Sequence, residues 1–186
     1  MEFEITKKAK RNTLLIAGGG LLLTLIGIIT NFDDHHFMTR FMASGLINTF
    51  YFFAIGLGAL FFLALAYATE TGWYAAVKRV IEAVAGFLPY GIGLFGIVLL
   101  VITMMDGAHI YSWMDPEVVA HDEMIEGKSA YLNKPFFWIR TVVYFAVYLI
   151  FLNGFRKRSL EEDKIGGTEL HFKNYRRGAL FLVFFA

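Results

Sequence analysis

Four long apolar runs set the strongest limit on how this chain can fold. They lie at about 14–30, 41–67, 83–105 and 136–155 of a 186-residue chain in which 57% of residues are hydrophobic and only 18% are charged. An α-helix rises 1.5 Å per residue, so about 20 apolar residues cross the ~30 Å hydrocarbon core of a bilayer. Helices also satisfy their backbone hydrogen bonds internally, which lipid requires. The sequence therefore predicts an all-α integral membrane protein built as a transmembrane four-helix bundle.

A fifth apolar run, 179–186, contains only eight residues. Eight residues are too few to cross a bilayer as a helix. We therefore expect this run to be the truncated start of a fifth span, and the chain to be a fragment of a longer polytopic protein. The expected order is an N-terminal transmembrane bundle over 1–155 with an outer loop at 106–134, and then a basic cytoplasmic loop at 156–178.

Lysine and arginine are distributed unevenly between the two sides of the predicted bundle. Four precede the first span, two lie between the second and third, and seven follow the fourth, so 13 of the 17 lie on one side. Cytoplasmic flanks carry such an excess, which predicts a cytoplasmic N-terminus. The outer segments contain three cations and eight carboxylates, a formal charge of −5. Because the basic clusters flank spans, they indicate topology and contact with lipid headgroups, and we expect no nucleic-acid partner.

The sequence contains no cysteine. Iron-sulfur clusters need thiolate ligands, and c-type haem is attached through cysteine. We therefore expect no metal site and no redox cofactor bound by this stretch of chain itself.

Ionisable and aromatic side chains gather on the outer side, where a water-lipid boundary suits an amphipathic, lipid-soluble molecule such as a quinol. Histidine is a candidate partner for a quinol hydroxyl, whereas b-type haem is less favoured because these histidines lie at span ends. A loop histidine that only bonds a nearby carboxylate, with Trp113 and Tyr111 as interfacial anchors, is the alternative. No catalytic residue is assigned. The candidates for a quinone site in this outer polar cluster are Asp33, His35, His36, Asp106, His109, Trp113, Asp115 and Arg140.

Polar groups within or beside the spans suggest a second kind of site, because ionisable side chains in hydrocarbon are costly. They are candidates for part of a proton route between the two faces. The alternative is that the two glutamates among them are solvated span ends paired with Lys78 and Arg79. Pro89 interrupts the third run and predicts a kink there. The proton-route candidates are Glu70, Lys78, Glu82, Tyr90, Thr103 and Asn48.

The outer loop contains the most specific motif in the chain. It reads His-Ile-Tyr-Ser-Trp-Met-Asp-Pro-Glu-Val-Val-Ala-His-Asp from His109 to Asp122, and is followed by Tyr131-Leu-Asn, Pro135-Phe-Phe and Arg140. This motif, together with the order of the spans, resembles the ActF membrane subunits of bacterial alternative complex III, a quinol:cytochrome c oxidoreductase. These subunits are related to the NrfD/polysulfide reductase membrane-subunit family. The resemblance covers most of the chain.

The resemblance implies a multi-pass subunit of the bacterial inner membrane with the 106–134 loop on the periplasmic side. It implies a role as scaffold of the complex, with a quinone-like cavity or part of a proton route, and quinol or menaquinol as the ligand. Haem c and iron-sulfur clusters would be carried by other subunits. The implied partners are an ActC-like membrane subunit, an iron-sulfur subunit, multi-haem cytochrome c subunits, lipids and a terminal oxidase.

Two other classes of function stay open at the level of sequence. Glycines, a kinked span and intramembrane charges also suit a subunit of a small-molecule or ion transporter, although no inverted repeat is visible. The other class is a purely structural membrane subunit with no site.

Overall fold

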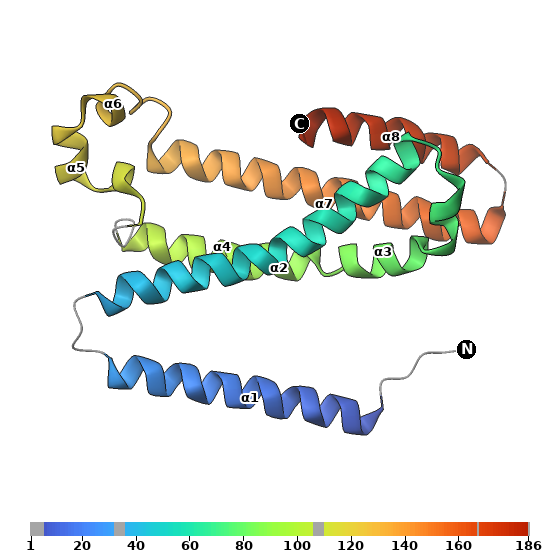
Figure 1. Cartoon of the computed structure of the whole chain (residues 1–186). Helices are drawn as coiled ribbons and strands as arrows, with labels where there is room; N and C mark the ends of the chain where they lie inside the picture. Colours follow the sequence, from blue (N-terminus) through green and yellow to red (C-terminus); the bar gives the residue numbers. More distant parts are fainter. Residues whose placement is uncertain (1–5, 32–35, 106–109, 167, 186) are drawn as a thin grey trace. The chain divides into compact units, whose positions relative to one another are not determined.

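The computed structural model describes residues 6–31, 36–105, 110–166 and 168–185, and these residues are helical with short connections (Figure 1). Four helical segments are long and apolar enough to cross a membrane: Lys7–Thr30, Phe37–Ala68, Lys78–Met104 and Lys134–Ile165. These segments confirm the prediction of an all-α chain with four candidate membrane spans. The chain divides into two compact units, Met1–Phe41 and Met42–Ala186, which are described separately.

The first unit contains α1 (Lys7–Thr30) and the start of α2 (Phe37–Ala68). The hydroxyl oxygen of Thr6 caps α1 by accepting from the backbone N–H of Ala9 at 3.4 Å, which satisfies one of the free donors of the first turn. At the start of α2, the rings of Phe37 and Phe41 stack with centroids 5.8 Å apart.

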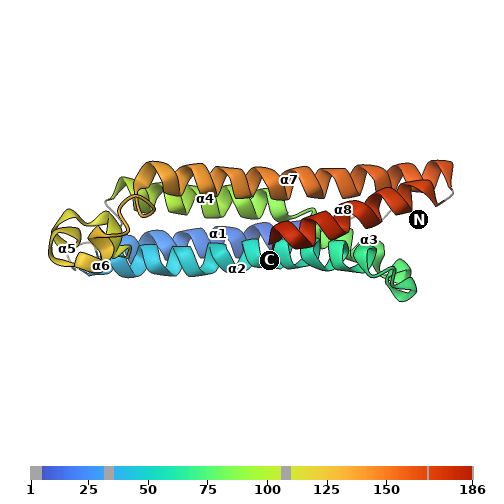
Figure 2. The same cartoon turned by 90° about the horizontal axis from the view of Figure 1, so that it is seen from above.

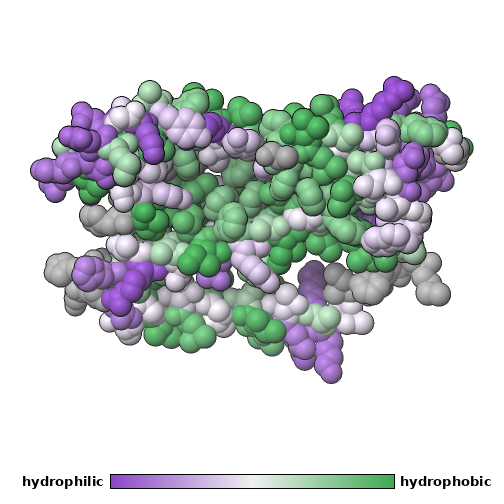
Figure 3. Space-filling model, turned by 45° about the horizontal axis from the view of Figure 1, so that its top comes forward, coloured by the Kyte–Doolittle hydropathy of each residue, from purple (hydrophilic) through white to green (hydrophobic). Residues whose placement is uncertain are grey.

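The second unit contains the rest of α2 and the other helices. These are η1 (Gly72–Ala76), α3 (Lys78–Ala85), α4 (Leu88–Met104), η3 (Ser112–Met114), α5 (Pro116–His121), α6 (Glu123–Glu126), α7 (Lys134–Ile165) and α8 (Glu169–Phe185). The helices α7 and α8 pack side by side and run in opposite directions (Figures 1 and 2). Figure 3 shows hydrophobic side chains in the middle of the face in view and polar side chains toward its left and right sides.

Proline residues mark where several helices begin. Pro116 lies in the first turn of α5 and Pro89 in the first turn of α4, where a missing N–H costs no helical hydrogen bond. Pro89 has no N–H to donate to the carbonyl of Ala85. Just before it the hydrogen bonds change from the α-helical to the shorter i to i−3 pattern, with Phe87 N–H donating to Val84 O at 3.0 Å. The predicted kink in the third span is therefore confirmed as a break between α3 and α4.

Small residues let the helices of the second unit approach closely. A Cβ atom added to Gly91 would lie 3.1 Å from the Cα of Phe53, and one added to Gly178 would lie 2.6 Å from the carbonyl oxygen of Ala64. The first contact joins α4 to α2 and the second joins α8 to α2. Such approaches are typical of helix packing in membranes, where van der Waals contact drives association.

The helices extend well beyond the predicted apolar runs. α1 begins seven residues before the predicted start at 14, and α7 continues ten residues past the predicted end at 155. Within the predicted basic cytoplasmic loop at 156–178, residues 156–165 continue α7 and residues 169–178 begin α8. Run length measures only the part of a helix inside hydrocarbon, and lysine, arginine and glutamate continue a helix readily into water. The cytoplasmic location of this connection stays a prediction.

Candidate functional site

A pocket of about 240 Å³ opens between α2, α4 and α7, beside the segment that leads into η3. Its walls are almost entirely apolar rings, with hydroxyls on a few of them. We call it the aromatic pocket, and it is lined by Phe53, Phe95, Leu99, Tyr111, Phe137, Thr141, Tyr144, Phe145 and Tyr148.

The inner wall of the aromatic pocket is a fixed stack of phenylalanines from three helices. The rings of Phe53 and Phe95 lie nearly parallel, 14° apart, with centroids separated by 5.3 Å. Phe145 from α7 meets Phe53 edge-on at 5.8 Å. Both arrangements are preferred by aromatic pairs, and Phe53 is buried. The close approach of α4 at Gly91 holds these rings together, so the wall is preformed.

One side of the pocket comes from Tyr111, which lies just before η3, and from Phe137 in the first turns of α7. Tyr111, Trp113 and Phe137 form a cluster in which the ring centroids of Trp113 and Phe137 are 5.5 Å apart and those of Tyr111 and Phe137 are 6.2 Å apart. Burial raises the pKa of Tyr111, so its phenol stays protonated and can donate a hydrogen bond at neutral pH. The segment before η3 therefore adds a phenol donor to the lining of the pocket.

The hydroxyl of Thr141 is already engaged within its own helix. It donates to the carbonyl of Phe137 at 2.9 Å, so it remains available to the pocket only as an acceptor. Further along α7, the rings of Tyr144 and Tyr148 stack with centroids 6.4 Å apart. The pocket can hold a flat apolar ring and offer it phenol donors from tyrosine and one hydroxyl acceptor.

A second hollow, of about 310 Å³, adjoins the aromatic pocket along α2. It shares Phe95 and Tyr111 with the pocket and is completed by Leu46, Ile47 and Phe50. We call it the side groove. All three of its additional residues are apolar, which suits a hydrocarbon chain.

The predicted outer polar cluster does not line the aromatic pocket where its members are described. The carboxylate of Asp115 caps α5 by accepting from the N–H of Glu117 at 3.0 Å. The guanidinium carbon of Arg140 lies 3.8 Å from the ring centroid of Tyr131 and 4.7 Å from that of Phe136. Trp113 touches the pocket indirectly, through its contact with Phe137. His36 belongs to the first unit, and Asp33, His35, Asp106 and His109 lie outside the described residues.

The predicted proton-route residues are dispersed. Asn48 donates to the carbonyl of Ser44, and Thr103 to that of Leu99, both at 2.8 Å within their own helices. Tyr90 is 71% exposed. Glu70 is an exposed turn residue with a φ of 51°, a left-handed conformation. Of the six, the structure brings together Lys78 and Glu82.

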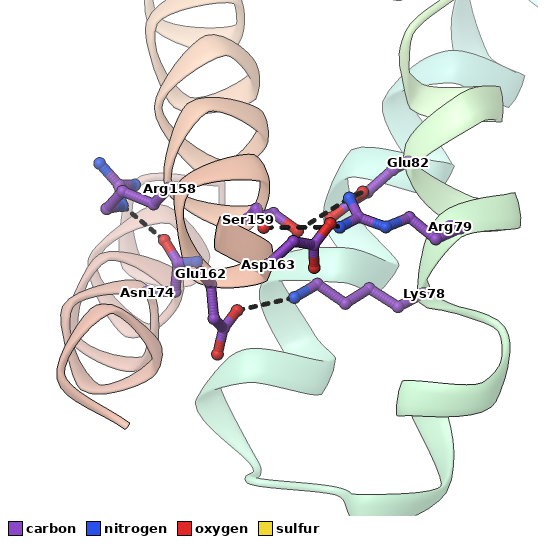
Figure 4. Close-up of polar contacts among 8 residues, drawn as sticks. All are labelled: Lys78, Arg79, Glu82, Arg158, Ser159, Glu162, Asp163 and Asn174. Atoms are coloured by element: carbon purple, nitrogen blue, oxygen red, sulfur yellow. Dashed lines mark hydrogen bonds and ion pairs between the residues drawn. The ribbon is translucent and has the colours of Figure 1, made fainter. Parts of the chain in front are cut away.

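Lys78 and Glu82 belong to a polar cluster between α3, α7 and α8 (Figure 4). Lys78 Nζ lies 2.9 Å from Glu162 Oε2, and Arg79 contacts both Glu82 and Asp163. The sequence alternative, that the glutamate at this position is a solvated span end paired with a neighbouring cation, holds in part. Glu82 pairs with Arg79, but it is buried and not solvated. We call this the basic-end cluster; its members are Lys78, Arg79, Glu82, Arg158, Ser159, Glu162, Asp163 and Asn174.

Sequence reasoning missed most of both sites. In the basic-end cluster, Ser159 and Asn174 are fully buried, and Arg158 donates to Asn174 Oδ1 at 2.5 Å. A signal was present, because Ser159, Glu162 and Asp163 recur three to four residues apart and so share one face of a helix. Treating 156–178 as a loop hid that face.

The chain was compared with known proteins. No protein-family model matches it, and no curated protein matches it. Within the described residues, no group of three or more His, Asp or Glu side chains could hold a metal ion. The resemblance to ActF subunits therefore stays a prediction from the motif. The structure itself contributes four candidate membrane spans, three of which line the aromatic pocket.

Proposed function

We propose that this chain is a membrane subunit of a quinol:cytochrome c oxidoreductase of the alternative complex III type, and that its aromatic pocket holds the head of a quinol such as menaquinol. The observation that carries this proposal is the preformed aromatic pocket with Tyr111 in its lining. In this proposal the chain also helps to scaffold the complex, in the bacterial inner membrane with the loop facing the periplasm.

The chemistry of the pocket suits a quinone head. The ring is flat and apolar, so it packs well against the stacked rings of Phe53 and Phe95. Its oxygen atoms need hydrogen-bond partners, and the protonated phenol of Tyr111 offers one to a quinone carbonyl. A quinol hydroxyl can instead donate to the Oγ1 of Thr141.

The size of the site is also compatible with a quinone that carries an isoprenoid tail. The aromatic pocket alone, at about 240 Å³, is smaller than the ~300–1,000 Å³ of typical ligand sites. The side groove, which shares Phe95 and Tyr111 with it, extends the available space along apolar residues. The tail would leave toward lipid through this groove.

Electrons from a bound quinol would have to pass to partner subunits. The chain contains no cysteine to ligate an iron-sulfur cluster or to attach haem c. The proposal therefore places those cofactors on an iron-sulfur subunit and on multi-haem cytochrome c subunits, beside an ActC-like membrane subunit.

The assembly part of the proposal is tested by purifying the tagged full-length protein in mild detergent. Multi-haem absorption in the visible spectrum, and haem-protein and iron-sulfur chains identified by mass spectrometry, are the expected result. A colourless protein that purifies without such partners would contradict the assignment and would favour the transporter.

The binding part is tested by titrating a menaquinone analogue and following the thermal unfolding of the protein, because a ligand that binds only the folded state stabilises it. We expect Tyr111→Phe, which keeps the ring and removes the donor, to weaken binding by about tenfold. Tyr131→Phe is the matched control on the same loop, since Tyr131 does not line the pocket. No stabilisation of the unmodified protein at saturating analogue would favour a purely structural subunit.

A further inference from the structure

A separate pocket lies at the other end of the second unit, between α3 and α7. It measures about 220 Å³ and combines charged with apolar walls. We call it the headgroup pocket, and its lining residues are Arg79, Glu82, Ala83, Gly86, Arg156 and Leu160.

The headgroup pocket lies where the apolar part of the helices gives way to charge. Arg156 directly follows the apolar run of α7 that ends near Phe155, and Arg79 lies in the first turn of α3, before the apolar run of α4. For helices that cross a bilayer, this level is that of the phospholipid headgroups. The apolar residues Ala83 and Leu160 complete the wall, as expected of a site that also meets a lipid chain.

The charges around the pocket balance. Arg79 is held by Glu82 and Asp163, as Figure 4 shows, and its Nη1 also donates to the hydroxyl of Ser159 at 3.2 Å. Arg156 is exposed and forms no ion pair with another residue in the described part of the chain. The lining itself carries two guanidinium groups and one carboxylate, and Asp163, which pairs with Arg79 from outside the lining, brings the formal charge to zero. A ligand of net zero charge that carries both signs therefore suits the site better than a net anion.

One acceptor in the wall is unsatisfied. Glu82 is 9% exposed, and its Oε1 is buried without a hydrogen-bond partner among the described residues. A buried carboxylate oxygen in this state is costly unless something donates to it. The last side-chain torsion of glutamate has a broad range of allowed angles. A small rotation of the carboxyl group can therefore turn this oxygen toward a donor in the pocket.

We propose that the headgroup pocket binds the head of a phosphatidylethanolamine molecule. The phosphate pairs with Arg156, which has no carboxylate partner of its own, and the ammonium donates to the carboxylate of Glu82. Arginine matches phosphate oxygens through several N–H donors. A choline headgroup carries the same charges but has no N–H to donate, so the unsatisfied oxygen of Glu82 makes the site selective for ethanolamine.

The headgroup pocket is a site independent of the proposed quinol site. The headgroup pocket shares no residue with the aromatic pocket or the side groove. Loss of lipid retention and loss of quinone binding are therefore separate results.

The test is native mass spectrometry of the full chain in detergent, with added phosphatidylethanolamine, phosphatidylcholine or phosphatidylglycerol of identical acyl chains. We expect the ethanolamine lipid to be retained about tenfold more strongly than the choline lipid. Arg156→Ala should lower retention of both the ethanolamine and the choline lipid about tenfold, because both lose the partner of their phosphate, and the exposed residue should tolerate the change. Lys157→Ala is the matched control, because it removes the neighbouring exposed cation, which does not line the pocket. Glu82→Gln should bring the ratio of ethanolamine to choline retention close to one.

Equal retention of the ethanolamine and choline lipids would overturn the proposal, as would stronger retention of phosphatidylglycerol. Equal effects of Arg156→Ala and Lys157→Ala would show that general basicity, and not the pocket, holds the lipid. Soluble phosphoethanolamine is the final arm. If it binds as strongly as the lipid, the ligand is a free phosphoethanolamine and the assignment to a membrane lipid is wrong.

Discussion

Lys78 and Glu162 are 84 residues apart in the chain, yet the side-chain nitrogen of one lies 2.9 Å from a carboxylate oxygen of the other. The pair joins α3 to α7, and both side chains are largely buried, with 14% and 21% of their surface exposed. Removing one partner of such a pair costs more than removing one partner of a pair on an open surface, because the remaining charge is left buried without compensation.

We therefore expect Lys78→Ala to lower the free energy of unfolding by about 2 kcal/mol. A double-mutant cycle with Glu162→Ala, measured by denaturant unfolding in detergent, should show clear coupling between the two changes. Lys173→Ala is the control, because Lys173 lies 3.6 Å from Glu169 in an exposed pair and should cost less than about 1 kcal/mol. Equal costs for Lys78→Ala and Lys173→Ala would contradict the structural role given to the Lys78 pair.

The helix crossing at Gly178 leads to a prediction about packing. A Cβ atom there would lie 2.6 Å from the carbonyl oxygen of Ala64, and backbone cannot move aside as a side-chain end can. Gly178→Val should therefore destabilise the fold by about 1–3 kcal/mol through overpacking. Gly58→Val is the control, since no atom lies within 4 Å of a Cβ at that glycine. Thermal unfolding of both variants in the same detergent checks the difference, and similar losses would refute the close crossing of α8 and α2.

Arg140 is predicted to hold the end of the outer loop. Its guanidinium group lies over the rings of Tyr131 and Phe136, which places a cation on two aromatic faces where α7 begins. Such an interaction contributes about 1 kcal/mol. Arg140→Leu should speed hydrogen exchange of the amides near Tyr131 about fivefold. Lys128→Ala, which removes another cation from the same loop, should leave their exchange unchanged; a similar acceleration in both variants would remove the special role of Arg140.

The raised pKa of Tyr74 predicts how the free energy of unfolding depends on pH. Burial, with a smaller contribution from neighbouring Tyr67, raises the pKa of Tyr74 above its ordinary value of 10.0. The folded state thus holds this proton more tightly than the unfolded state does. The resulting stability is fully present below pH 10 and is lost as the pH rises toward the folded-state pKa, at up to about 1.4 kcal/mol per pH unit.

This dependence is measured by unfolding the protein at a series of alkaline pH values. Tyr74→Phe should flatten the decline, because the variant has no proton to lose at this position. Tyr131→Phe, a change at an exposed tyrosine, should leave the decline as it is. If Tyr74→Phe loses as much stability at alkaline pH as the unmodified protein does, groups other than Tyr74 control the decline.

The four candidate spans could be predicted from the sequence because membrane insertion depends on a local property. A run such as 41–67 is apolar enough to enter hydrocarbon whatever the rest of the chain does, and α2 (Phe37–Ala68) contains it. The break at Pro89 was predictable for the same reason, since a missing N–H acts within one turn. Helix ends were not predictable in this way, as the extension of α7 beyond 155 shows, because water tolerates a charged helix as well as a charged loop.

The aromatic pocket and the basic-end cluster could not be predicted in this way, because both depend on contacts between segments far apart in the chain. Asp115, a candidate ligand by residue type, caps a short helix, whereas Phe53 and Phe95, which look like ordinary packing residues, line the aromatic pocket. Hydropathy and charge along the chain are enough to show which segments can cross a membrane and where charge gathers. The contact of Lys78 with Glu162 and the burial of Glu82 depend on how the helices pack. Hydropathy acts on each segment separately, whereas an ion pair or a pocket exists only when particular faces of several helices meet.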